Sequence, residues 1–135
     1  IHDLYENGKE VWENGRYFTE LITERAVNYF TELAENDSGK PFFSYIAYTD
    51  PHYPMHAPEK YVSMFEHLPE DRQIMAAKIK ALDESIGEIM KTLKDNGQLE
   101  NTVIFFMGDN GPSREIGKFH RYFSDFFKSR RREYS

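Results

Sequence analysis

The sequence predicts an α/β fold in which helices flank a mostly parallel sheet. Two short, almost continuously apolar segments, residues 42–48 and 102–107, have the composition of strands that are buried on both faces. A longer segment with helical periodicity, residues 70–95, separates them. A strand, a helical crossover and a second strand form a βαβ unit, and this connection makes the two strands parallel.

The composition is that of a folded domain and argues against several classes of protein. The chain has 135 residues, of which 39% are hydrophobic and 16% aromatic, so it can bury a core and is not generally disordered. The net charge of −6 argues against a nucleic-acid partner. Without cysteine, these residues contain no disulfide, Cys-ligated zinc or cysteine nucleophile. No apolar run is long enough to cross a bilayer, so we expect no membrane partner.

The chain is interpreted as one partial domain with three parts. Residues 1–18 are predicted to be an irregular lead-in with a short hairpin at its Asn-Gly turns. Residues 19–115 form the α/β core, and residues 116–135 form a divergent basic tail. The chain begins with Ile1 and ends in a charged run, so we expect a segment of a longer protein. The sequence makes no prediction about oligomeric state.

Three helices are predicted from apolar periodicity and end signals. The first follows Thr19 as N-cap and ends near Asn36. A short second helix begins at Pro58 and continues to Phe65. The third covers residues 70–95 and is closed by an Asn-Gly pair.

Chemistry-bearing side chains follow both predicted strands. His52 lies in the proline-rich loop 49–58, where Asp50 is interpreted as a loop-stabilising residue. Asp109 and Asn110 come directly after the strand 102–107. Ligands of parallel α/β sheets bind beyond the carboxyl ends of the strands, so we expect these groups to face one crevice. Carboxylate and amide oxygens suit calcium or magnesium, and a histidine can act as acid or base near neutral pH.

These segments resemble the central part of the type I sulfatases, which are arylsulfatase-like members of the alkaline-phosphatase-like superfamily. The resemblance covers residues 5–115 and rests on four sequence elements: Lys40-Pro41-Phe42-Phe43-Ser44-Tyr45, Pro51-His52-Tyr53-Pro54, Ala81-Leu82-Asp83-Glu84-Ser85-Ile86-Gly87, and Asn101-Thr102-Val103-Ile104-Phe105-Phe106 running into Gly108-Asp109-Asn110-Gly111. The Pro-His-x-Pro and Asp-Asn-Gly elements are specific as a pair, although each alone is a weak signal.

The resemblance implies a fold, a reaction and site residues. The fold is part of an alkaline-phosphatase-like mixed, mostly parallel sheet flanked by helices. The reaction is hydrolysis of a sulfate ester by a formylglycine hydrate, with a divalent cation, usually Ca²⁺ with Mg²⁺ as the alternative. Asp109 and Asn110 correspond to cation ligands, and His52 to the residue that contacts the sulfate ester and protonates the leaving oxygen. Lys118 is the candidate for the sulfate-binding lysine.

The sequence also departs from the family pattern. The formylglycine precursor motif, Cys/Ser-x-Pro-x-Arg, belongs to the family's N-terminal part and is absent from this chain. Two alternatives therefore stay open: a phosphoester or phosphonate hydrolase of the same superfamily, and a catalytically silent chain that binds a sulfated ligand. The resemblance implies a small sulfate ester or a sulfated glycan as the partner and favours an extracellular or periplasmic location. It leaves the particular sulfate ester open.

The 135 residues alone are expected to show no sulfatase turnover, because the covalent nucleophile lies outside them. The measurement is release of the alcohol from an aryl sulfate by the isolated chain, with and without added calcium. A steady rate or a burst, from protein shown to be free of contaminating enzyme, would contradict this expectation.

Overall fold

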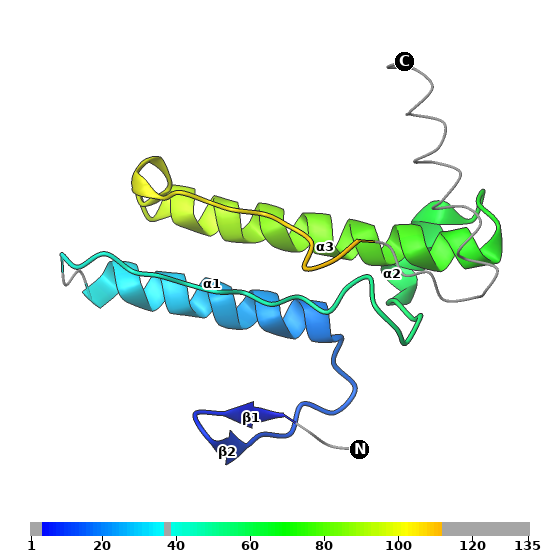
Figure 1. Ribbon diagram of the computed structural model, residues 1–135, viewed down its shortest axis with the longest axis horizontal. Coiled ribbons are helices and arrows are strands. Elements are labelled where there is room, and N and C mark those ends of the chain that lie inside the picture. The colour runs from blue at the N-terminus through cyan, green and yellow to red at the C-terminus, as the bar shows by residue number, and fades with distance from the viewer. Residues whose placement is uncertain (1–3, 37–38, 112–135) are drawn as a thin grey trace.

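The computed structural model describes residues 4–36 and 39–111 of the chain. Two long helices, α1 (Phe18–Asn36) and α3 (Glu70–Asp95), lie side by side and run in the same direction (Figure 1). The shorter elements are β1 (Tyr5–Glu6), β2 (Lys9–Glu10), the helix α2 (Glu59–Val62) and the 3₁₀ turns η1 (Ser63–Phe65) and η2 (Leu99–Asn101). Within the described residues, no helix is both long and apolar enough to cross a membrane.

The three helices predicted from periodicity are confirmed, with one correction at the first of them. The backbone N–H of Leu21 already bonds to the carbonyl of Tyr17, so α1 begins at Phe18 and Thr19 lies inside its first turn. The prediction of Thr19 as N-cap is therefore wrong, because the helix begins before it. The Thr19 side chain is buried, and its hydroxyl donates a tertiary hydrogen bond to Asp50.

The C-terminal end of α3 follows the predicted Asn-Gly signal. Gly97 has a positive φ of 70°, the left-handed conformation that glycine adopts without a steric cost. Its N–H bonds to the carbonyl of Lys94 at 3.0 Å, and the N–H of Gln98 bonds to that of Leu93 at 2.8 Å. These two bonds satisfy carbonyl groups that the end of the helix leaves without partners.

The predicted hairpin is also present. Its two turn residues, Asn7 and Gly8, have φ values of 52° and 77°, as a tight two-residue hairpin requires. Arg25 of α1 pairs with Glu6 at 3.4 Å and with Glu13 at 2.9 Å. These ion pairs link the lead-in segment to the first helix.

Small side chains and a few large ones form the core between the helices. One cluster is contributed by α1 and α3: Ala26, Phe30, Ile89 and Leu93. A second cluster lies nearer the start of α3 and consists of Tyr61, Ala77 and Ala81. Both clusters are apolar, so burial of their surface is the main force that holds α1, α2 and α3 together.

The predicted burial of residues 42–48 and 102–107 as strands is wrong for the described part of the chain. Among the described residues, the sheet that forms is the β1–β2 hairpin of residues 5–10, and the mixed, mostly parallel sheet is not confirmed. Phe43 is 89% exposed and Phe105 is 83% exposed. A strand needs hydrogen-bonding neighbours, and full burial needs cover on both faces. In the part of the chain that the structure describes, helices cover these segments on one side at most.

The two segments nevertheless keep features of strands in an α/β unit. Phe42, Ile46 and Tyr48 pack against the α1–α3 core, whereas Phe43 and Tyr45 are exposed, which is the alternation of an extended chain. Both segments run opposite to the helices and in the same direction as each other (Figure 1). This course is the one that a helix–strand–helix–strand unit of a parallel sheet requires.

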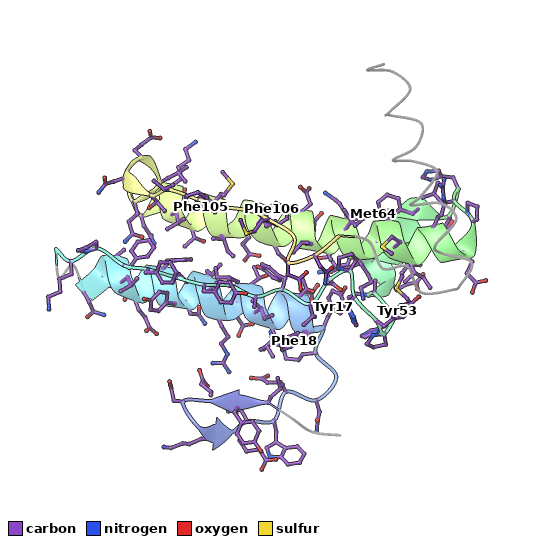
Figure 2. The ribbon with its side chains drawn as sticks, viewed as in Figure 1. Tyr17, Phe18, Tyr53, Met64, Phe105 and Phe106 are labelled. Carbon is purple, nitrogen blue, oxygen red and sulfur yellow. The ribbon has the colours of Figure 1, made fainter. Side chains whose placement is uncertain are left out.

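The exposed aromatic side chains are visible along the second segment. Figure 2 shows Phe105 and Phe106 on the chain that passes along α3, and Tyr17 and Tyr53 toward the other end of that helix, near α2. Phe106 is 71% exposed, as is expected for a strand that the described residues leave uncovered.

Candidate functional site

His52 is an exposed residue of the loop formed by residues 49–58. The loop turns tightly at this point, because the N–H of His52 donates to the carbonyl of Thr49 at 2.8 Å. Residues 51–54 are all exposed, so the imidazole is open to solvent. The ring nitrogen Nδ1 lies 3.1 Å from the carbonyl oxygen of Tyr53. Since a carbonyl only accepts, a hydrogen bond here requires a proton on Nδ1, and Nε2 is the other nitrogen of the exposed ring.

Asp50, two residues before His52, is buried and fully partnered. Its side chain is 4% exposed. The hydroxyl groups of Tyr17, at 2.7 Å, and of Thr19 both donate to its Oδ2. Oδ1 lies 3.0 Å from the ammonium nitrogen of Lys78. The carboxylate therefore ties the loop to the first turn of α1 and to α3, which fits the interpretation of Asp50 as a loop-stabilising residue.

Lys78 is the site residue that the sequence prediction missed. It belongs to α3, its side chain is 3% exposed, and its ammonium group also donates to the carbonyls of His52 and, at 3.0 Å, of Pro54. One signal could have identified it: Lys78 falls on the apolar stripe of the helix, between Met75 and Leu82, where a lysine is out of place.

The buried Asp50 carboxylate influences the pKa of Tyr17. Burial, together with the hydrogen bond to Asp50, raises the pKa of the Tyr17 hydroxyl well above its ordinary value. The edge of the Tyr17 ring also contacts His56, with ring centroids 5.9 Å apart. Tyr17 thus joins the loop to the start of α1 through both its hydroxyl and its ring.

Asp109 and Asn110 lie at the end of the described chain, and both are exposed. In Figure 1, the segment that carries them runs toward the same end of α3 as the His52 loop. Within residues 4–36 and 39–111, no hydrogen bond joins His52 to Asp109 or Asn110. Lys118, the predicted sulfate-binding lysine, lies outside the described residues.

The side chains that follow residue 107 have the donor chemistry of a hard-cation site. A carboxylate from Asp109 and an amide oxygen from Asn110 are ligands that calcium and magnesium accept. Calcium takes about six to eight oxygen ligands. Among the described residues, no group of three or more His, Cys, Asp or Glu side chains is arranged to hold a metal. The two residues therefore suit such a cation as part of a larger ligand set.

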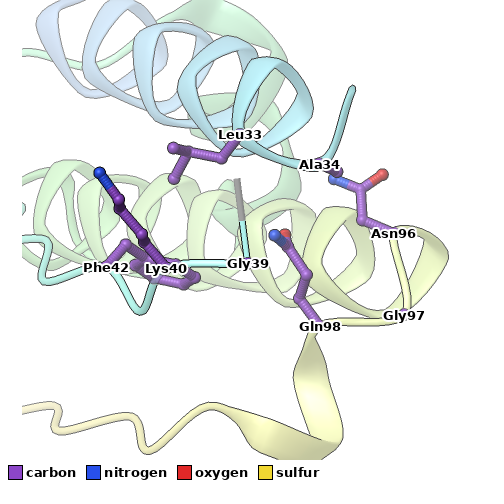
Figure 3. A pocket seen from close by; sticks show the side chains of 8 residues that line it. All are labelled: Leu33, Ala34, Gly39, Lys40, Phe42, Asn96, Gly97 and Gln98. Atoms are coloured by element: carbon purple, nitrogen blue, oxygen red, sulfur yellow. The ribbon is translucent and has the colours of Figure 1, made fainter. Parts of the chain in front are cut away.

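A separate hollow of about 340 Å³ lies at the opposite end of the helices, where α1 and α3 both end (Figure 3). Figure 3 shows Gln98 and Lys40 among its lining side chains. In the described part of the chain, the side-chain oxygen of Gln98 is buried and has no hydrogen-bond partner. The hollow contains none of the predicted site residues.

Comparison with known proteins gives a consistent family assignment. A family model described as Sulfatase matches residues 2–131 of the chain. The match continues past residue 115, where the sequence elements quoted above end. It therefore includes every predicted site residue, from His52 to Lys118.

Individual relatives agree with that match. Arylsulfatase J of Mus musculus is 38% identical over 122 residues, which cover 86% of this chain and 19% of that protein. The uncharacterized sulfatase YdeN of Escherichia coli (strain K12) is 32% identical over 110 residues, which cover 80% of this chain and 19% of that protein. The chain therefore spans about a fifth of the length of the relatives that it matches.

A solved structure has the same arrangement of elements. The crystal structure of Ps i-CgsB matches with a TM-score of 0.63 and 35% identity, over 68% of this chain and 20% of that chain. A crystal structure of Ps i-CgsB in complex with k-i-k-neocarrahexaose matches with the same values.

Replacing Tyr17 by phenylalanine is expected to make the free energy of unfolding depend less on pH above about 10. Because the folded state raises the pKa of this hydroxyl, its contribution to stability is complete below the unfolded pKa of about 10 and is lost as the pH rises toward the folded pKa. One such group adds a slope of at most about 1.4 kcal/mol per pH unit. Urea unfolding from about pH 9 to about pH 11 measures this slope.

The matched control is Tyr29→Phe, at an exposed position on the same helix. It is expected to keep the wild-type pH dependence of unfolding. Equal slopes for wild type and Tyr17→Phe would contradict the placement of the Tyr17 hydroxyl against a buried carboxylate.

Proposed function

The chain belongs to the sulfatase family, and we propose that it is the central part of a longer enzyme that hydrolyses sulfate esters. The observation that carries the proposal is the exposed His52 side chain on a loop with a buried support. The buried Lys78 donates to the backbone carbonyl of His52 and pairs with the buried Asp50. A surface histidine without a function does not need such a support. The family match supports the choice of a sulfate ester over other substrates.

His52 serves as the proton donor to the leaving oxygen. Breaking the S–O bond of a sulfate ester leaves negative charge on that oxygen, and an acid placed beside it supplies the missing proton. The Nδ1 contact with the Tyr53 carbonyl orients the ring and leaves Nε2 as the nitrogen that is available to a substrate. After the proton transfer, Nε2 is unprotonated and is able to accept a proton from water.

Asp109 and Asn110 would hold a divalent cation, with calcium as the first choice from the family resemblance. When bound, such a cation withdraws charge from the sulfate oxygens and orients the group. Both side chains offer oxygen donors at the solvent-exposed end of one segment, which supports this role. The rest of the site lies outside the described residues. It would consist of the remaining cation ligands, the formylglycine nucleophile and a sulfate contact, for which Lys118 is the candidate.

A sulfated glycan is the substrate class that we favour, with small aryl sulfates as the second. The support is the oligosaccharide, k-i-k-neocarrahexaose, that the Ps i-CgsB structure contains. An extracellular or periplasmic location would agree with such a substrate and remains a prediction from the family resemblance.

In the full-length protein that contains these residues, His52→Ala is expected to lower kcat for phenyl sulfate by about 10²–10⁴-fold. The loss is expected to be smaller for 4-nitrophenyl sulfate, because 4-nitrophenol is the stronger acid and leaves with less help from a proton. The measurement is steady-state release of each phenol at saturating substrate and saturating calcium.

The matched control is His67→Ala, which removes an exposed histidine that follows η1. It is expected to leave both rates unchanged. Turnover of a phosphate monoester but of no sulfate ester would replace the proposal with a phosphoester hydrolase. Binding of a sulfated sugar without turnover of either ester would replace it with a silent binding protein.

A further inference from the structure

We propose that Lys78 is a positioning residue, which holds the His52 loop in the conformation that presents the imidazole to a substrate. This inference rests on the proposed function for its catalytic meaning, but its structural part stands on the contacts alone. Lys78 lies on α3, 26 residues after His52, and donates to the carbonyl of His52 from beneath the loop. Its hydrogen bond at His52 is to the backbone and not to the ring nitrogens.

The ammonium group of Lys78 meets three oxygen atoms of the loop. It donates hydrogen bonds to the carbonyl of His52 and, at 3.0 Å, to the carbonyl of Pro54. It also forms an ion pair with Oδ1 of Asp50 at 3.0 Å. All three oxygen atoms belong to residues 50–54, the segment with His52 at its centre. Lys78 therefore fixes the chain before, at and after His52.

The part of the loop next to His52 has little apolar packing to hold it in place. Residues 51–54 are exposed, so they bury little apolar surface. The Asp50 carboxylate joins Lys78 to the hydroxyls of Tyr17 and Thr19 at the start of α1. The buried ion pair therefore links the backbone at His52 to both long helices.

A buried ion pair adds little to the stability of a core, because apolar side chains of similar volume often give an equal or greater free energy of unfolding. Lys78 occupies a stripe where the neighbouring buried residues are Ala77 and Ala81. An apolar residue at 78 would satisfy the packing but would leave the two loop carbonyls without a donor. The polar contacts with the loop are what distinguishes a lysine at this position.

The first test is amide hydrogen exchange in the 135-residue chain. In Lys78→Met, the His52 amide, which bonds to Thr49, is expected to exchange at least about tenfold faster than in wild type. The helix-interior amides of Phe30 and Ile89 serve as internal references. Lys80→Met is the control, because Lys80 is on the same helix and forms ion pairs with the exposed residues Asp83 and Glu84.

A second variant guards against a general loss of stability. Lys78→Met leaves Asp50 buried without its cation, which could unfold the chain. The double variant Asp50→Asn, Lys78→Met removes that charge and keeps an oxygen acceptor for Tyr17 and Thr19. In this variant we expect fast exchange at His52 and less than about twofold change at Phe30 and Ile89. Unchanged exchange at His52, or equal acceleration at all three amides, would overturn the inference.

The catalytic part is tested in the full-length protein with phenyl sulfate and 4-nitrophenyl sulfate. The double variant is expected to lower kcat for phenyl sulfate at least about tenfold more than for 4-nitrophenyl sulfate, as a displaced acid would. An equal loss for both substrates would overturn a role in presenting the acid. If wild type cleaves no sulfate ester, the proposed function fails, and the exchange data alone decide whether Lys78 holds the loop.

Discussion

The buried contact between Asp50 and Lys78 is the interaction on which the rest of this structure depends. It joins three segments that are distant in sequence: the start of α1 through Tyr17 and Thr19, the His52 loop, and the N-terminal half of α3. Two charges out of water are costly unless every donor and acceptor has a partner. Here both carboxylate oxygens and the ammonium group have partners, so the pair acts as a rigid anchor below an exposed imidazole.

Apolar packing is present at both ends of the helix pair, whereas the polar anchor lies at one end. Phe30 and Leu93 hold α1 and α3 together toward their C-terminal ends, near the hollow lined by Gln98. The polar anchor lies toward the opposite end, beside the second apolar cluster of Tyr61, Ala77 and Ala81. The loop with His52 and the segment with Asp109 also run to this end. Apolar packing holds the helices together, and the polar contacts add a link to the exposed residues around His52.

The helices could be predicted from the sequence, but the environment of the strands could not. Periodicity and end signals are local, so α3 and its Gly97 stop follow from neighbouring residues alone. Burial of residues 102–107 depends on strands and helices that the described residues do not supply, and no local pattern reveals that. Among site residues, the His52 motif was recognisable, whereas Lys78 was missed because a lysine is ordinarily assigned to the solvent side of a helix. Thr19 was misassigned because α1 begins before it, and its partner Asp50 is 31 residues away.

The most direct measurement of this central contact is a double-mutant cycle on urea unfolding of the chain, with Asp50→Asn, Lys78→Met and the double variant. Residues in a shared buried network show coupling energies of about 0.5–3 kcal/mol, whereas independent residues show almost none. We expect a coupling energy above about 1 kcal/mol, with the double variant more stable than the sum of the single losses implies. A coupling energy near zero would contradict the buried ion pair and, with it, the anchored His52 loop.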